Sequence, residues 1–145
     1  LSESKELAAD LMTSGDLDFL DMSLWDCFKE PEEEEFKGKT LIQHFCELER
    51  GTTRLGVAGN LRTPQDVTKA LEEGVDWIML GRAAILHHDF PKLYEEDDQF
   101  VPSQIPVSVD YLTQEGLSPK FIEYMSNWGF VDGSVDRMKE AIKKA

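Results

Sequence analysis

The sequence has few cysteines, few basic residues and no long apolar run. Two cysteines in 145 residues exclude a disulfide framework and a four-cysteine metal cluster, and they favour a reducing, cytoplasmic environment. No run of about 18 apolar residues occurs, so we expect no membrane-spanning helix. The 15 basic residues are outnumbered by 29 acidic ones, and the formal net charge of -14 argues against nucleic acid and anionic membranes as partners.

The apolar content, 41% of the chain, suffices for a core without disulfide or metal staples. The chain starts at Leu1 without a methionine, in a segment with helical spacing and without the basic start and apolar middle of a secretion signal. We therefore expect a processed product or a piece of something longer.

Helical and strand patterns alternate in the first part of the chain. Apolar spacing predicts helices over residues 3–14, 39–49 and 63–73, and short strands over residues 17–22, 55–58 and 76–80. Alternation of helices with short apolar strands indicates parallel strands joined by crossover helices, hence an α/β sheet or part of a barrel. Beyond residue 91 the pattern becomes irregular and acidic, and two helices are predicted over residues 119–128 and 135–144.

Two successive strands end in glycine, in the runs Ala58-Gly59-Asn60 and Leu80-Gly81-Arg82. At the carboxyl end of a parallel strand a glycine lets a ligand approach the backbone, and the next helix offers free N–H groups and a positive dipole end. This arrangement suits a phosphate, which the Arg82 guanidinium could clamp. The alternative is that both glycines serve only turns and that Arg82 is a surface cation.

The charge distribution favours the anion site. Residues 50–82 contain five basic and four acidic residues, a local charge of +1, whereas the remaining residues carry 10 basic and 25 acidic ones, or -15. The stretch without excess negative charge, residues 50–82, is therefore the one proposed to hold a phosphate.

Several runs resemble the old yellow enzyme family of NADH:flavin oxidoreductases. They are Leu55-Gly56-Val57-Ala58-Gly59-Asn60, Thr63-Pro64-Gln65-Asp66, the segment 71–85 that contains Gly81 and Arg82, and His88-Asp89-Phe90-Pro91. In that family, similar runs span the seventh and eighth strands of a TIM barrel. The family's sixth strand is similar to the run Asp18-Phe19-Leu20-Asp21-Met22-Ser23. Asn60 replaces a second glycine that is common among bacterial members, but Asn tolerates positive φ.

The resemblance implies FMN binding, with the flavin phosphate held by the N–H groups of Gly59, Asn60, Gly81 and Arg82 and by the Arg82 guanidinium. This location agrees with the phosphate site of many barrels. It also implies a C-terminal half-barrel over residues 1–93, followed over residues 94–145 by an irregular acidic segment and a helical tail packing on it. The family's catalytic residues lie on the first five strands, which this chain lacks, so we assign no catalytic and no metal-binding residue.

The expected function is therefore that of a C-terminal fragment of an FMN-dependent NAD(P)H oxidoreductase, inactive alone, whose parent enzyme uses NADH or NADPH. One alternative is a non-catalytic half-barrel that pairs with itself or with a complementary half through open sheet edges. Another is a different phosphate-binding TIM-barrel enzyme, against which the Gly-Arg turn followed by Asp-Phe-Pro argues.

Other side chains with chemical potential have simpler interpretations. His44 and Cys46 point to different helix faces and Cys27 lies in a loop, which disfavours a metal site. The pair His87-His88 at a helix start suggests solvent-facing or backbone-bonded imidazoles. We expect packing for Trp77, a solvated or capping role for Asp21 and Asp26, and for Trp25 a surface position that could line a site.

Overall fold

The computed structural model describes residues 1–144 and divides the chain into two compact units, the first spanning Leu1–Gly81 and the second beginning at Arg82. The division lies earlier than the predicted boundary at residue 93, because Ile85 and Leu86 pack in the core of the second unit. None of the helices within residues 1–144 has the length and apolar character needed to cross a bilayer.

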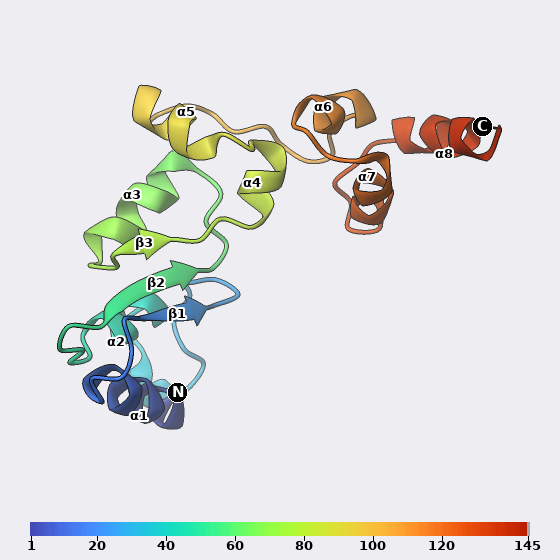
Figure 1. Ribbon diagram of the computed structural model, residues 1–145. Coiled ribbons are helices and arrows are strands. Elements are labelled where there is room, and N and C mark those ends of the chain that lie inside the picture. Colours follow the sequence, from blue (N-terminus) through green and yellow to red (C-terminus); the bar gives the residue numbers. More distant parts are fainter. Residues whose placement is uncertain (145) are drawn as a thin grey trace. The chain divides into compact units, whose positions relative to one another are not determined.

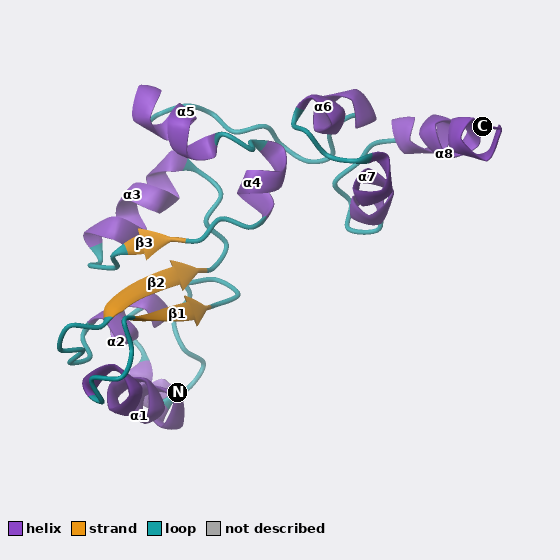
Figure 2. Ribbon diagram, viewed as in Figure 1, coloured by secondary structure: helices purple, strands orange, loops and turns teal. Residues whose placement is uncertain are grey.

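The first unit is an α/β structure with a three-stranded parallel sheet (Figure 1 and Figure 2). Its elements are α1 (Ser2–Thr13), β1 (Phe19–Ser23), the 3-10 turn η1 (Glu34–Phe36), α2 (Leu41–Cys46), β2 (Arg54–Ala58), α3 (Pro64–Glu72) and β3 (Trp77–Ile78). The predicted alternation and the parallel strands are confirmed. Helix α2 and strand β3 are shorter than predicted, since α2 begins only after its cap at Thr40 and β3 pairs through two residues.

The strands follow one another in the sheet in the order β1-β2-β3, which is also their order in the chain. Right-handed crossovers of such a sheet put successive helices on the same face. One core accordingly joins alternate strand residues to apolar residues of α1, α2 and the segment around α3; its fully or nearly buried members include Met12, Met22, Ile42, Leu55, Val57 and Ala70.

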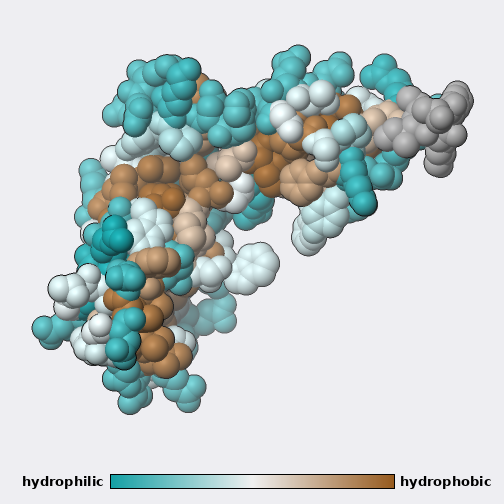
Figure 3. All heavy atoms as spheres, viewed as in Figure 1, coloured by the Kyte–Doolittle hydropathy of each residue, from teal (hydrophilic) through white to brown (hydrophobic). Residues whose placement is uncertain are grey.

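The other sheet face carries Phe19, Asp21, Arg54 and Trp77, of which Phe19 is 52% exposed. Hydrophobic side chains reach the surface over the sheet of this unit (Figure 3). Within the first unit, the sheet therefore has one face covered by helices and one covered only by its own side chains.

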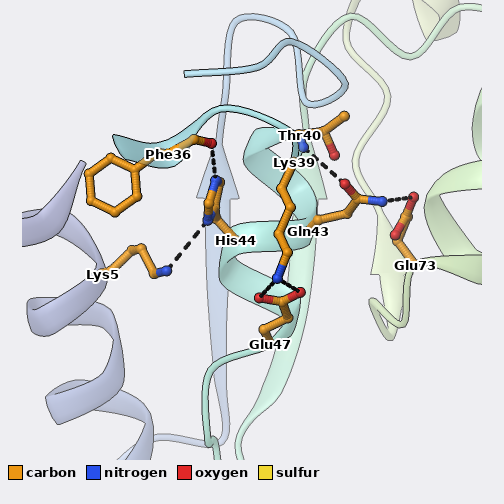
Figure 4. Close-up of polar contacts among 8 residues, drawn as sticks. All are labelled: Lys5, Phe36, Lys39, Thr40, Gln43, His44, Glu47 and Glu73. Atoms are coloured by element: carbon orange, nitrogen blue, oxygen red, sulfur yellow. Dashed lines mark hydrogen bonds and ion pairs between the residues drawn. The ribbon is translucent and has the colours of Figure 1, made fainter. Parts of the chain in front are cut away.

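A buried histidine joins three segments of the first unit (Figure 4). His44 of α2 is 5% exposed, and its Nε2 lies 2.8 Å from the carbonyl oxygen of Phe36, to which it donates. Its Nδ1 lies 3.4 Å from Nζ of Lys5 in α1, and the Lys5 ammonium lies 5.6 Å from the centre of the Phe36 ring. These contacts hold η1 and the acidic segment before it against α1 and α2.

The second unit is helical. Its elements are α4 (Arg82–Leu86), α5 (Phe90–Glu96), α6 (Val109–Gln114), α7 (Pro119–Ser126) and α8 (Ser134–Lys144). Its core contains Leu86, Leu112, Ile122, Met125, Phe130, Val131 and Val135. The two helices predicted here are confirmed as α7 and α8. Helix α5 was not predicted, because the regular pattern was expected to end at residue 91, whereas Pro91 occupies the first turn of this helix, where proline is tolerated.

Candidate functional site

The two glycine turns follow neighbouring strands. Gly59 comes directly after β2, and Gly81 follows the loop that leaves β3. Because β2 and β3 pair in parallel, both turns lie at the carboxyl edge of the sheet. Arg82 is the residue next to Gly81 in the chain and the first residue of α4 and of the second unit.

Gly59 is required by the packing of the chain itself. A Cβ at this position would lie 2.8 Å from the backbone nitrogen of Cys27 and 2.9 Å from the carbonyl oxygen of Leu24, distances that side chains do not adopt. The carbonyl of Gly59 accepts a hydrogen bond of 3.2 Å from the Cys27 N–H. By contrast, nothing lies within 4 Å of a Cβ built on Gly81. The close approach at Gly59 is therefore made by the loop after β1.

Asn60 has a φ of 56°, so the left-handed turn expected at this position is present. Its Nδ2 donates to Oδ2 of Asp26 over 3.1 Å, and its Oδ1 accepts from Nε of Arg62 over 2.8 Å. Asp26 also accepts from the backbone N–H of Phe28. The loops after β1 and β2 are thus joined at this edge by a chain of carboxylate, amide and guanidinium.

The start of α3 is already capped. The Thr63 hydroxyl accepts from the N–H of Asp66, and the Asp66 carboxylate accepts from the N–H groups of Arg62 and Thr63, each over 2.9 Å. The predicted cap is confirmed. The expectation that this helix offers free N–H groups to an anion is corrected, because the N–H groups of Asp66 and Val67 donate to the hydroxyl and the carbonyl of Thr63.

Other donors at the two turns stay unused. Within residues 1–144, the backbone N–H groups of Gly59, Asn60, Gly81 and Arg82 donate no hydrogen bond. The Arg82 side chain is exposed and, in the same part of the chain, makes no ion pair. Backbone N–H groups and a guanidinium are donors that suit a phosphate, so the chemistry of these residues fits a phosphate group.

The other basic residues of the stretch 50–82 have structural partners. Arg50 lies 3.3 Å from Asp76 and donates to the Gly74 carbonyl, and the Lys69 ammonium lies 4.1 Å from the centre of the Phe28 ring. The guanidinium of Arg54 lies over the Trp77 ring, and Arg62 bonds Asn60. Four of these five basic side chains therefore make structural contacts within the first unit. Among the five, Arg82 alone makes no described contact.

The remaining candidates are placed as follows. Trp25 is 94% exposed beyond β1, and Trp77 packs on the sheet. Cys27 is buried and Cys46 is half-buried. His87 accepts a hydrogen bond at Nε2 from the backbone N–H of Ser103, as expected for a backbone-bonded imidazole.

His88 bonds Glu115, which lies 27 positions away in the sequence. Nothing in the local pattern around His88 pointed to this partner.

Comparisons of the chain with protein-family models, with curated proteins and with solved structures found no match. The old yellow enzyme family therefore stays a prediction from the sequence runs around Gly59 and Gly81.

Proposed function

We propose that this chain provides the flavin-phosphate site of an FMN-dependent NAD(P)H oxidoreductase of the old yellow enzyme type. The phosphate would accept hydrogen bonds from the N–H groups of Gly59, Asn60 and Gly81, and from Arg82, which follows Gly81 directly. The observation that carries the proposal is the set of unused N–H donors after two adjacent parallel strands.

The topology supports the same proposal. Parallel strands in chain order with the helices on one face are the repeating arrangement of a TIM barrel, whereas a doubly wound sheet reverses its strand order and covers both faces. In barrels, phosphate sites are common in the loops after the seventh and eighth strands, which the family resemblance assigns to β2 and β3.

FMN, when bound, would supply the redox chemistry, accepting hydride from a nicotinamide and passing it to an acceptor. This chain's own residues would bind and orient the phosphate end. No residue of this chain is proposed as catalytic, and we expect no NADPH-dependent reduction of an enone by the purified chain. Flavin that co-purifies together with such activity would contradict this assignment.

The test compares FMN with riboflavin, which has the same ring system without the phosphate. We expect FMN to bind at least about tenfold more tightly, because charge-assisted hydrogen bonds contribute about 1.5–3 kcal/mol. Arg82→Ala should reduce FMN affinity and leave riboflavin unaffected. Arg137→Ala, which removes an exposed arginine of α8, is the matched control.

A second variant should raise FMN affinity, in contrast to Arg82→Ala. Asp26→Asn removes the negative charge that lies 3.1 Å from the Asn60 side chain and keeps an oxygen that can accept that bond. FMN affinity should therefore rise, most clearly at low salt. Equal affinity for FMN and riboflavin in the wild-type chain, or no saturable FMN binding, would overturn the proposed function.

A second candidate function is self-association through the sheet. In the described part of the chain, β1 and β3 each pair with β2 alone, so both outer edges are open, and the uncovered face exposes Phe19. Open parallel edges favour pairing with another strand. Light scattering should then find a dimer that gains stability with salt, because salt screens the charge of -14. A monomer at all concentrations would exclude it.

A further inference from the structure

Three side chains of the second unit that bind metals well lie together. His88 and Asp89 stand between α4 and α5, and Glu115 follows α6 (Figure 1). One potential ligand atom from each lies within 4.8 Å of the others. The three residues come from two segments that are distant in the sequence, so the fold of this unit brings them together.

The two segments are held firmly. The backbone N–H of His88 donates to Oε2 of Glu115 over 2.9 Å, and Nδ1 of His88 lies 2.8 Å from the same oxygen. The Glu115 side chain is only 16% exposed. The Tyr111 hydroxyl donates to the Leu86 carbonyl over 2.7 Å, which joins α6 to α4 next to the cluster.

The Asp89 carboxylate lacks the hydrogen bond that its position before a helix would usually give it. It occupies the position before α5 where an aspartate usually caps the helix, yet its side chain makes no capping hydrogen bond. Within residues 1–144 the Asp89 carboxylate accepts no hydrogen bond of any other kind. Instead a carboxylate oxygen lies close to the Glu115 carboxylate, and His88 supplies at most one positive charge for the two acids. Two neighbouring carboxylates repel each other, and a divalent cation relieves that repulsion.

We propose that His88, Asp89 and Glu115 form a binding site for a divalent transition metal ion, best suited to Zn²⁺. One imidazole and two carboxylates are a donor set that Zn²⁺ accepts, and three protein ligands leave a coordination position for water. The backbone N–H of His88 would keep the Glu115 carboxylate oriented, as outer-shell donors do in metal sites. The site lies in the second unit and does not depend on flavin binding.

The test uses the full chain, stripped with a chelator and titrated with Zn²⁺ alone in a calorimeter. We expect one saturable site per chain, weakened about tenfold or more by Asp89→Asn and by Glu115→Gln. Glu115→Gln keeps an oxygen to accept the His88 N–H, so its fold should persist and circular dichroism can verify this. Glu96→Gln, an exposed acid of α5 paired with Lys92 over 3.8 Å, is the matched control and should bind as the wild type does.

Nuclear magnetic resonance supplies an independent readout. Zn²⁺ should shift the ring signals of His88 and leave those of His44 in place. The proposal would be overturned by the absence of saturable Zn²⁺ binding, by equal affinity of the wild type and both cluster variants, or by shifts confined to residues outside the cluster.

Discussion

Trp77 donates its indole N–H to Oδ1 of Asp21 over 3.0 Å, and the two residues belong to the two outer strands of the sheet. They reach each other over Gly56, which is the partner of both in the register of the middle strand. A Cβ on Gly56 would clash with the indole nitrogen of Trp77, so the absence of a side chain makes room for the bond.

Replacing Gly56 should therefore destabilise the first unit. In Gly56→Ala the indole must leave its position, which costs the Asp21 bond and the edge contact between Trp77 and Phe19. We expect a loss of about 1–3 kcal/mol, the usual cost of overpacking, in urea unfolding followed by circular dichroism. Trp77→Phe should lose less, because it removes the hydrogen bond and keeps a ring. An unchanged unfolding midpoint in Gly56→Ala would contradict this account.

The two glycines of the proposed phosphate site should differ in their tolerance of a side chain. Gly59→Ala forces a methyl group against the backbone of Leu24 and Cys27, so it should cost about 1–3 kcal/mol. Gly81→Ala meets nothing within 4 Å and should stay within about 0.5 kcal/mol of the wild type. Parallel thermal unfolding of the two variants measures the difference, and equal losses would refute the close approach at Gly59.

Asn60 combines a left-handed backbone with two side-chain bonds, which substitutions can separate. Asn60→Gly keeps the favourable φ and loses the bonds to Asp26 and Arg62, whereas Asn60→Ala loses the bonds and also strains the backbone. We expect Asn60→Ala to be the less stable of the two by about 1 kcal/mol. Denaturant titrations check the order, and the reverse order would show that the turn is not left-handed.

His44 should be important for the stability of the first unit. In His44→Phe the Phe36 carbonyl loses its donor and Lys5 loses its acceptor, so we expect a loss of about 1–3 kcal/mol. The control is Lys39→Ala, which breaks the ion pair with Glu47 seen at 2.6 Å between half-exposed side chains (Figure 4). Surface pairs of this kind contribute below about 1 kcal/mol. Comparable losses in the two variants would argue against the role of His44.

The cysteines should react slowly in the folded protein. Burial, with a smaller contribution from Asp26, raises the pKa of Cys27 from 9.0 to about 11, and burial raises that of Cys46 likewise. At pH 8 the thiolate fraction is then about 100-fold lower than in the unfolded chain. A time course of iodoacetamide labelling by mass spectrometry should show slow modification, which denaturant accelerates.

The raised pKa values of the two cysteines also make the free energy of unfolding depend on pH. The folded chain holds both thiol protons more tightly than the unfolded chain, so this contribution is complete below pH 9 and is lost as the pH rises toward 11. Labelling at pH 8 that proceeds as fast with and without denaturant would contradict both statements.

Local signals predicted the α/β part of the fold well. Thr63, Pro64 and Asp66 define the start of α3, and Gly74, with a φ of 102°, defines its end, because caps and left-handed turns depend on neighbouring residues alone. Helix α6 was missed although Ser108 caps it through the Tyr111 N–H, since its six residues show too little periodicity.

The candidate sites were less predictable. The turns at Gly59 and Gly81 could be recognised from spacing, but the bond between Asp26 and Asn60 joins residues 34 positions apart. The same holds for the pair formed by His88 and Glu115. Such contacts depend on how strands and helices pack, which no short window of sequence contains.

Two clusters of buried hydrophobic residues lie in the described chain, one in each unit, with no member in common. Heating or denaturant can therefore melt the sheet and the helices in separate transitions, and a single melting temperature would then describe neither. Trp77 and Trp128 lie in different units, so fluorescence of variants that keep one of them would assign each transition. A mutational loss of stability in this protein has meaning only for the unit that contains the substituted residue.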